Sequence, residues 1–170
     1  MFCEIGYSSD KSIEIKAGYF KPEDKVFRDV YSSGVKFGLE GSIEAVKNLE
    51  VWVGVDYFHK TGKITLTKEE TKVRIIPFGA GIMYDIPVQS WLKLSLGGGV
   101  QYYSFKEENL LGTVTDGKVG FIIKGGGFFI LSPNFGFNVF VNYSWCKMKP
   151  GEVEFKVGGL EAGAGLGFIF

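Results

Sequence analysis

Hydrophobic and polar residues alternate one by one along most of the chain. In residues 135–146, one face holds Phe135, Phe137, Val139, Val141, Tyr143 and Trp145. The intervening positions carry mostly small or polar residues, such as Gly136, Asn138 and Asn142. Because successive side chains of a strand point to opposite sides, this pattern predicts a β-strand with one apolar and one polar surface.

Seven further segments repeat the alternation, so the sequence predicts eight strands. The other seven are residues 12–21, 35–44, 49–58, 72–84, 91–105, 118–131 and 154–170. Two of these are irregular, because the apolar positions change parity at Pro77 and again near Gly158 and Gly159. A parity change at a proline predicts a β-bulge.

The predicted connections alternate between long and short. The long, polar ones follow every second strand, at residues 21–33, 59–71, 106–117 and 148–154, and the short ones span 45–48, 85–90 and 132–134. Long loops at one end and tight turns at the other describe an antiparallel up-and-down meander. An even number of strands places both chain ends beside the tight turns.

The two faces of the strands decide what surrounds such a barrel. An eight-stranded barrel has an interior just wide enough for side chains, which suits the face of Gly, Ser, Asn and single charges. The face rich in Phe, Leu, Val, Ile and Tyr is then outside. Only a membrane tolerates that surface, so we expect an all-β, eight-stranded antiparallel up-and-down transmembrane β-barrel, not a soluble cup of the lipocalin type.

Aromatic residues gather near the ends of the predicted strands. One set lies toward the long loops and comprises Tyr19, Tyr57, Tyr102, Tyr143 and Trp145. The other lies toward the short turns and comprises Tyr84, Phe135, Phe168 and Phe170. Strands favour aromatics in general, but two bands at these heights predict aromatic girdles at the two membrane interfaces.

Charged residues on the inward face predict a lumen network. Its acids are Glu14, Glu40, Glu44, Glu50, Asp56 and Glu161, and its bases are Lys16, Lys36, Lys72, Arg74, Lys93 and Lys124. A buried charge is costly unless it is paired. We therefore expect paired charges to fill the lumen together with Trp52, Gln101, Asn138 and Asn142, and a gated pore or proton-linked passage remains the alternative.

Composition narrows the function classes. The net charge is zero, which argues against a nucleic-acid partner. One His and two Cys are too few for a zinc site or a disulfide framework, and no cofactor is expected. No apolar run is long enough for a membrane helix. The first residues lack the features of a secretory signal, so we expect a mature chain carrying a start Met.

The last strand carries a recognisable ending. Leu166, Phe168 and Phe170 alternate up to the last residue, which resembles the C-terminal strand of outer-membrane β-barrel proteins, where a terminal Phe is recognised by the assembly machinery. Residues 12–170 are similar in layout to small barrels of the OmpA-barrel, OmpX and OmpW type. The resemblance implies a bacterial outer-membrane location, contact with outer-membrane lipid, and a periplasmic tail at residues 1–11. We also expect a monomer. The resemblance implies no activity, since these families share a pattern more than a site.

Few residues offer chemistry. Some eight-stranded barrels modify lipid A with a His and a Ser, and here His59, Ser104, Glu69 and Glu70 are the candidates; no local motif links them, and a loop His is usually only solvated. Cys3 and Cys146 belong to opposite ends of the barrel, about 25–30 Å apart, so we expect no disulfide. The runs Gly97–Gly99 and Gly125–Gly127 lack the context of a phosphate loop and are expected to relieve crowding inside strands.

Three functions follow from these patterns. The preferred one is a non-enzymatic outer-membrane protein with a structural, adhesive or surface-interaction role. The second is a narrow channel or carrier of small hydrophobic solutes, resembling the OmpW type, with a side opening near Pro77. The third is a lipid A-modifying enzyme. Basic residues expected in the outer loops are either solvated or in contact with lipopolysaccharide phosphates, and they are Lys21, Lys25, Arg28, Lys60, Lys63, Lys68 and Lys106.

Overall fold

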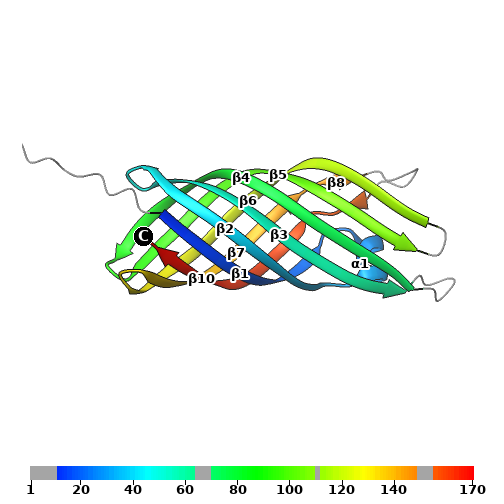
Figure 1. Ribbon diagram of the computed structural model, residues 1–170, viewed down its shortest axis with the longest axis horizontal. Coiled ribbons are helices and arrows are strands. Elements are labelled where there is room, and N and C mark those ends of the chain that lie inside the picture. Colours follow the sequence, from blue (N-terminus) through cyan, green and yellow to red (C-terminus); the bar gives the residue numbers. More distant parts are fainter. Residues whose placement is uncertain (1–10, 64–69, 110–111, 149–154) are drawn as a thin grey trace, which may run out of the picture.

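The computed structural model describes residues 11–63, 70–109, 112–148 and 155–170. Eight strands close into one barrel with antiparallel neighbours (Figure 1). They are β1 (Lys11–Pro22), β2 (Gly34–Val46), β3 (Leu49–Lys63), β4 (Glu70–Gln89), β5 (Leu92–Asn109), β6 (Gly112–Ser132), β7 (Phe135–Trp145) and β10 (Gly159–Ile169). The other elements are helix α1 (Lys25–Tyr31) and a two-stranded sheet of β8 (Lys147–Met148) and β9 (Phe155–Lys156). The predicted all-β, eight-stranded up-and-down barrel is confirmed.

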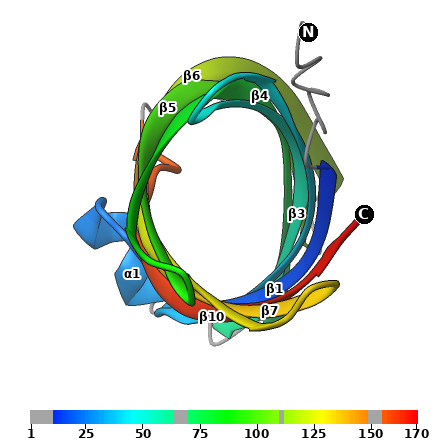
Figure 2. The ribbon, with the colours of Figure 1, turned by 90° about the vertical axis from the view of Figure 1, so that its left-hand side faces the viewer.

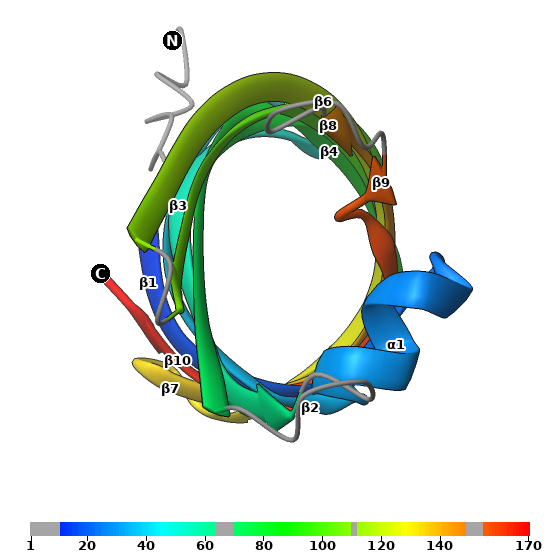
Figure 3. The same ribbon diagram turned by 90° about the vertical axis from the view of Figure 1, so that its right-hand side faces the viewer.

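The strands follow one another around the ring in chain order. The ring closes where β1 pairs with β10, from Ser12 opposite Ile169 to Pro22 opposite Gly159. Figures 2 and 3 show its oval outline from the two ends. The C-terminus lies at the end with the short turns, the turn end, and α1 lies at the opposite rim, the loop end. Of the predicted tail, residues 1–11, only Lys11 is described, and it begins β1.

The strands differ in length, and the excess lies at the loop end. β4, β5 and β6 have 20, 18 and 21 residues, whereas β7 and β10 have 11 each. Every described residue of 59–71 and 106–117 therefore belongs to a strand, so the strands extend into both predicted loops; residues 64–69 and 110–111 lie outside the described part. A strand whose outer face meets water carries polar residues on that face, so its composition resembles that of a loop.

The bulge predicted at Pro77 is also wrong. Pro77 pairs with Tyr103 of β5 in an unbroken register. The ladder to β3 passes over Ile76 and Pro77 and resumes in the same register. Toward the loop end from this point, Val73 and Ile75 are buried. The apolar positions change sides because the surroundings of the strand change, not because the strand contains an extra residue.

The second parity change coincides with a real break in the chain path. β9 ends at Lys156 and β10 begins at Gly159. A Cβ atom on Gly159 would lie 2.2 Å from the carbonyl oxygen of Lys21, and one on Gly158 would lie 2.3 Å from that of Ser144. Only glycine permits this close approach of neighbouring backbones.

A belt of exposed apolar side chains surrounds the barrel. Outward residues in the belt include Ile15, Phe37, Val53, Leu96 and Phe121, which are between 58% and 62% exposed. Soluble monomers rarely expose a continuous apolar surface of this kind, and a closed barrel satisfies its own backbone hydrogen bonds in lipid. The belt therefore faces the hydrocarbon of a bilayer. No helix in the described part of the chain is long and apolar enough to cross one.

Candidate functional site

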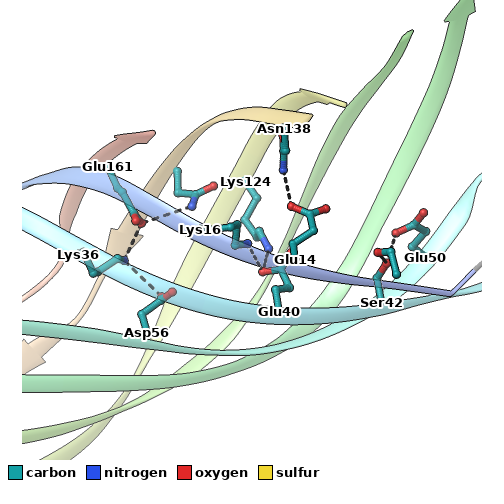
Figure 4. Close-up of polar contacts among 12 residues, drawn as sticks. Glu14, Lys16, Lys36, Glu40, Ser42, Glu50, Asp56, Lys124, Asn138 and Glu161 are labelled. Atoms are coloured by element: carbon teal, nitrogen blue, oxygen red, sulfur yellow. Dashed lines mark hydrogen bonds and ion pairs between the residues drawn. The ribbon is translucent and has the colours of Figure 1, made fainter. Parts of the chain in front are cut away.

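The centre of the lumen holds a charged layer built by β1, β2 and β6. Lys16 Nζ lies 2.5 Å from Glu40 Oε2, and Lys124 Nζ bonds to the same carboxylate oxygen (Figure 4). Asn138 donates to Glu14 Oε2 at 2.8 Å. These side chains come from alternate inward positions of their strands, which is why β-strand periodicity brings them together. All three charges of the Lys–Glu–Lys group are buried, so each depends on its partners.

A second charged layer lies toward the loop end. Lys36 Nζ lies 2.6 Å from Glu161 Oε2 and 3.3 Å from Asp56 Oδ2 (Figure 4). Asn142 donates to Glu161 at 3.4 Å. The Lys36 ammonium also lies 5.2 Å from the centroid of the Phe20 ring. The second charged layer thus borders apolar side chains on its loop-end side.

Trp52 occupies the lumen beside the first layer. Its ring centroid is 3.9 Å from Lys124 Nζ, a close cation–π contact. Glycines on the next two strands, β4 and β5, leave room for the indole: a Cβ atom on Gly99 would lie 2.7 Å from the Trp52 ring, and one on Gly79 would lie 3.1 Å from it. Gly99 of the run at 97–99 thus leaves space for the Trp52 side chain, which is buried in the lumen.

Toward the turn end, the lumen opens into a small polar vestibule. Ser42 donates to Glu50 and Ser95 donates to Asp85, each at 2.6 Å. The cavity has a volume of about 50 Å³ and extends from Lys93 at this end to the first charged layer. It has room for a few water molecules and ends where the paired charges begin.

Toward the loop end, the lumen is filled by apolar side chains, which we call the plug. From the barrel strands it takes Phe20, Phe58, Val73, Ile75, Tyr103 and Phe105, and from other segments Phe27, Tyr31, Cys146, Met148 and Val157. All of these are at most 4% exposed, so little water reaches this level. The sequence analysis did not find the plug. Phe27, Tyr31 and Met148 were assigned to loops and Val73 and Ile75 to the lipid face, while Phe20, Phe58, Tyr103, Phe105 and Cys146 fall on inward positions that were described only as small or polar.

Helix α1 covers part of the plug. Asp24 Oδ1 accepts from the Phe27 N–H at 3.2 Å, which caps the first turn. The helix ends at Tyr31, and the next residue, Ser32, has a left-handed φ of 58°. Tyr31 Oη lies 3.0 Å from Thr71 Oγ1 of β4, and burial raises the pKa of the Tyr31 phenol. Phe27 and Tyr31 are thereby held against the barrel interior.

The structure departs from the predicted lumen network at two residues. Lys72 and Arg74 are exposed on the outer wall, because β4 has left the belt at that level. Glu44 accepts from the N–H of Asn48 at 2.7 Å in the turn between β2 and β3. Asp85 is a buried acid that the predicted network lacked. It was assigned to a turn but lies in β4, and its position directly after a predicted strand was the signal that could have identified it.

The predicted girdle residues lie on the outer wall. Exposed members are Tyr19, Tyr57, Tyr84, Tyr102, Trp145, Phe168 and Phe170, while Phe135 and Tyr143 are half-buried. Tyr143 and Trp145 pack edge to face at 4.5 Å, and Phe135 and Phe168 at 5.4 Å. Trp91, in the turn between β4 and β5, is 50% exposed at the turn end. It was missed because, as the first residue of the predicted strand 91–105, it falls on the inward-facing positions.

The residues proposed for lipid A chemistry are not brought together. His59 lies opposite Arg74, and Ser104 lies opposite Ile76 on the far side of β4. Two strand spacings separate them, about 10 Å, too far for a hydrogen bond. Glu69 and the side chain of Glu70 lie outside the described residues.

Among the described residues, Cys146 has no disulfide partner and no metal-binding cluster occurs. Cys146 is a free, buried thiol whose pKa is raised by burial to about 11. Cys3 lies outside the described residues, so the expected absence of a disulfide stays a prediction. No group of three metal-binding side chains occurs among the residues described.

Comparison with known proteins gives similarity at the level of structure. No protein-family model matches the sequence, and no curated protein does. Neisserial surface protein A is 15% identical with a TM-score of 0.73, covering 94% of this chain and 97% of its own. The outer membrane protein OprG from Pseudomonas aeruginosa is 15% identical with a TM-score of 0.77, covering 95% and 96%. Ail, the attachment invasion locus protein of Yersinia pestis, in complex with the heparin analogue sucrose octasulfate, is 18% identical with a TM-score of 0.61, covering 94% and 99%.

These identities are low, but the structural agreement covers nearly all of each chain. The closed ring, its antiparallel order and its apolar belt correspond to the expected architecture. The chain has the fold of the small eight-stranded β-barrel proteins of bacterial outer membranes.

Proposed function

We propose that this protein is a non-conducting surface protein of the outer membrane, with a structural or surface-interaction role and no enzymatic activity. The observation that carries the proposal is the closed lumen: two charged layers, the Trp52 ring and the apolar plug lie in series. An ion would have to part buried ion pairs and then cross an apolar layer, and each step is costly.

The orientation follows from the general layout of such barrels. Short turns face the periplasm and the longer outer segments face outward, so the loop end with α1 faces the cell exterior. The belt contacts outer-membrane lipid, and the C-terminal Leu166, Phe168 and Phe170 are proposed to be read by the assembly machinery. We further propose a monomer without a nucleic-acid partner.

The structural feature that suggested a channel is absent from the described part of β4. The side opening was expected at a bulge near Pro77, and β4 keeps its register there. Similarity to OprG extends to the fold only, since the two chains are 15% identical.

Planar-bilayer recording tests the proposal. Folded protein is added to the membrane in high salt, with a sixteen-stranded porin as the conducting control. We expect no unitary current steps from this protein under conditions in which the porin gives regular steps. Steps that scale with the amount of folded protein and disappear after boiling would reject the closed lumen in favour of a channel.

A further inference from the structure

One side-chain oxygen in the lumen lacks a hydrogen-bond partner among the described residues. It is Oδ1 of Asn142, a side chain that is only 6% exposed. Glu161 fixes the orientation of the amide, because its carboxylate accepts from Nδ2 at 3.4 Å. A buried acceptor without a donor is costly, and folded proteins satisfy such groups with protein donors or with water. Asn142 Oδ1 therefore marks a place for a molecule that donates a hydrogen bond.

The vestibule leads from the turn end to this atom. Its cavity of about 50 Å³ is lined by Glu50 near the turn end and also by Asn142. Glu50 and Glu161, the partner of Asn142, lie at opposite ends of the row of polar contacts in Figure 4. The cavity thus extends along the first charged layer to a residue that contacts the second.

The first charged layer offers unused donors to the same cavity. Lys16 and Lys124 both line it. An ammonium group carries three N–H donors, and Glu40 Oε2 accepts one from each of the two lysines. The wall of the cavity therefore combines further N–H donors with the acceptor on Asn142.

This combination decides which kind of molecule fits. A small anion could accept from Lys16 and Lys124 but could not donate to Asn142 Oδ1. A cation could approach that oxygen, but the two ammonium groups would repel it. A neutral molecule that both donates and accepts satisfies all of these groups, and the cavity has room for a few water molecules.

We propose that water from the periplasm fills the vestibule, passes the first charged layer and donates to Asn142 Oδ1. The Lys–Glu–Lys group is then in contact with water and does not seal the barrel. The seal lies between Asn142 and the loop end, where the plug side chains are at most 4% exposed. The inference rests on the proposed function for the orientation that places the turn end in the periplasm.

The inward face along β7 offers three positions for locating the seal. Asn138, Asn142 and Cys146 are spaced four residues apart, and each interval corresponds to about 13 Å along the chain. Asn138 and Asn142 line the cavity, with Asn138 nearer the turn end, and Cys146 belongs to the plug. A thiol at each position reports whether a small ion arrives from the turn end, from the loop end or from neither.

The test uses Ag⁺, a small thiol-reactive ion, on protein folded into lipid vesicles. Asn138→Cys and Asn142→Cys are each made in a Cys3→Ser, Cys146→Ser background, and Cys3→Ser alone retains the thiol of Cys146. Ag⁺ is placed outside the vesicles or inside them, and the remaining thiol is counted after denaturation. Ser90→Cys, in the exposed turn between β4 and β5, identifies the turn-end side with an impermeant maleimide. Heat-dependent gel mobility confirms that each variant is folded.

We expect Asn138→Cys and Asn142→Cys to react at least about tenfold faster with Ag⁺ on the turn-end side, because an ion that crosses an apolar layer loses its hydration. Cys146 should react from neither side until the protein is denatured. Reaction of Asn138→Cys without reaction of Asn142→Cys would overturn this proposal, since the first charged layer would then be the seal, and it would leave the closed lumen of the proposed function intact. Equal reaction of Asn142→Cys from both sides would reject the closed lumen itself.

Discussion

The barrel strands run from the part within the apolar belt, the belt half, into the part nearer the loop end, the loop-end half. The faces that carry polar and apolar side chains are exchanged between these two halves. In the belt half, Val53 faces outward and Glu40 faces inward. In the loop-end half, Arg74 is on the outer wall and Phe105 is completely buried. Strand geometry is common to both halves, so the medium against the outer face decides the arrangement. Hydrocarbon selects an apolar wall around a polar lumen, and water selects the reverse.

The two interiors also differ in what stabilises them. The plug gains free energy by burying apolar surface. Buried ion pairs contribute little net stability, but removing one partner leaves an uncompensated charge. The comparison therefore implies that the charged layers are sensitive to the loss of a single carboxylate. It also implies that the outer wall tolerates a charge in the loop-end half but not in the belt half.

The largest effect is expected for Glu40→Ala. The change leaves both Lys16 and Lys124 without their shared acceptor, and breaking a buried charge group costs about 3–5 kcal/mol. Unfolding by urea in detergent micelles, followed by gel mobility, measures the loss of stability.

Glu50→Gln is the matched control for that change. Glu50 lies in the vestibule, where Ser42 donates to it at 2.6 Å and water has access. A glutamine can still accept this hydrogen bond, so the loss should be well under half that of Glu40→Ala. Equal losses in the two variants would show that the Lys–Glu–Lys group is not the coupled unit described above.

A smaller effect is expected when the outer wall is made positive. Val53 is 58% exposed in the middle of the belt, and a lysine facing lipid near the bilayer midplane costs about 2–4 kcal/mol. Thr61 is also outward on β3 but lies toward the loop end. Val53→Lys should therefore destabilise folding into lipid vesicles, while Thr61→Lys, which only adds a charge opposite Lys72 in water, should cost at most about 1 kcal/mol. Equal costs at both positions would place the two halves in the same medium.

The sequence was informative about the belt half for a physical reason. Lipid outside and a narrow lumen inside impose strict alternation, so Val139 and Val141 could be assigned to the outer face and Asn142 to the inner face without a structure. The inward positions of Lys16, Lys36, Glu40 and Lys124 followed from the same rule, and the structure buries all four.

The loop-end half was misread because the same rule was applied beyond the membrane. Lys72 and Arg74 were placed inside as polar residues, although water on the outer face makes the exterior the favourable place for them. The parity change at Pro77 marks the height at which the medium changes along β4, but a β-bulge produces the same local pattern. The partner choices within the lumen also depend on register between distant strands: Asn138 and Glu14 are 124 residues apart along the chain.

The smallest expected effect concerns an exposed ion pair at the loop end, which contrasts with the buried pairs of the lumen. Lys156 Nζ lies 2.6 Å from Glu23 Oε1, and the two side chains are 43% and 32% exposed. The hydrogen bond from Lys156 lowers the pKa of Glu23, and the same bond raises the pKa of Lys156. Because water screens this pair, Glu23→Gln should raise the hydrogen-exchange rate of the α1 amides only roughly two- to fivefold at neutral pH.

The pH dependence of that difference follows from the two shifts. A lowered carboxyl pKa stabilises the folded segment above the ordinary value of about 4.3, and the contribution is lost as the pH falls through the folded value. A raised ammonium pKa contributes below the ordinary value of about 10.4 and is lost as the pH rises through the folded value. The hydrogen-exchange rates of wild type and Glu23→Gln should thus differ between about pH 4.3 and about pH 10.4. They should converge below the folded pKa of Glu23 and above the folded pKa of Lys156. Asp29→Asn, an exposed acid-to-amide change in the same helix, should show no such window, and an identical profile for the two variants would mean that the Glu23–Lys156 pair does not hold α1 in place.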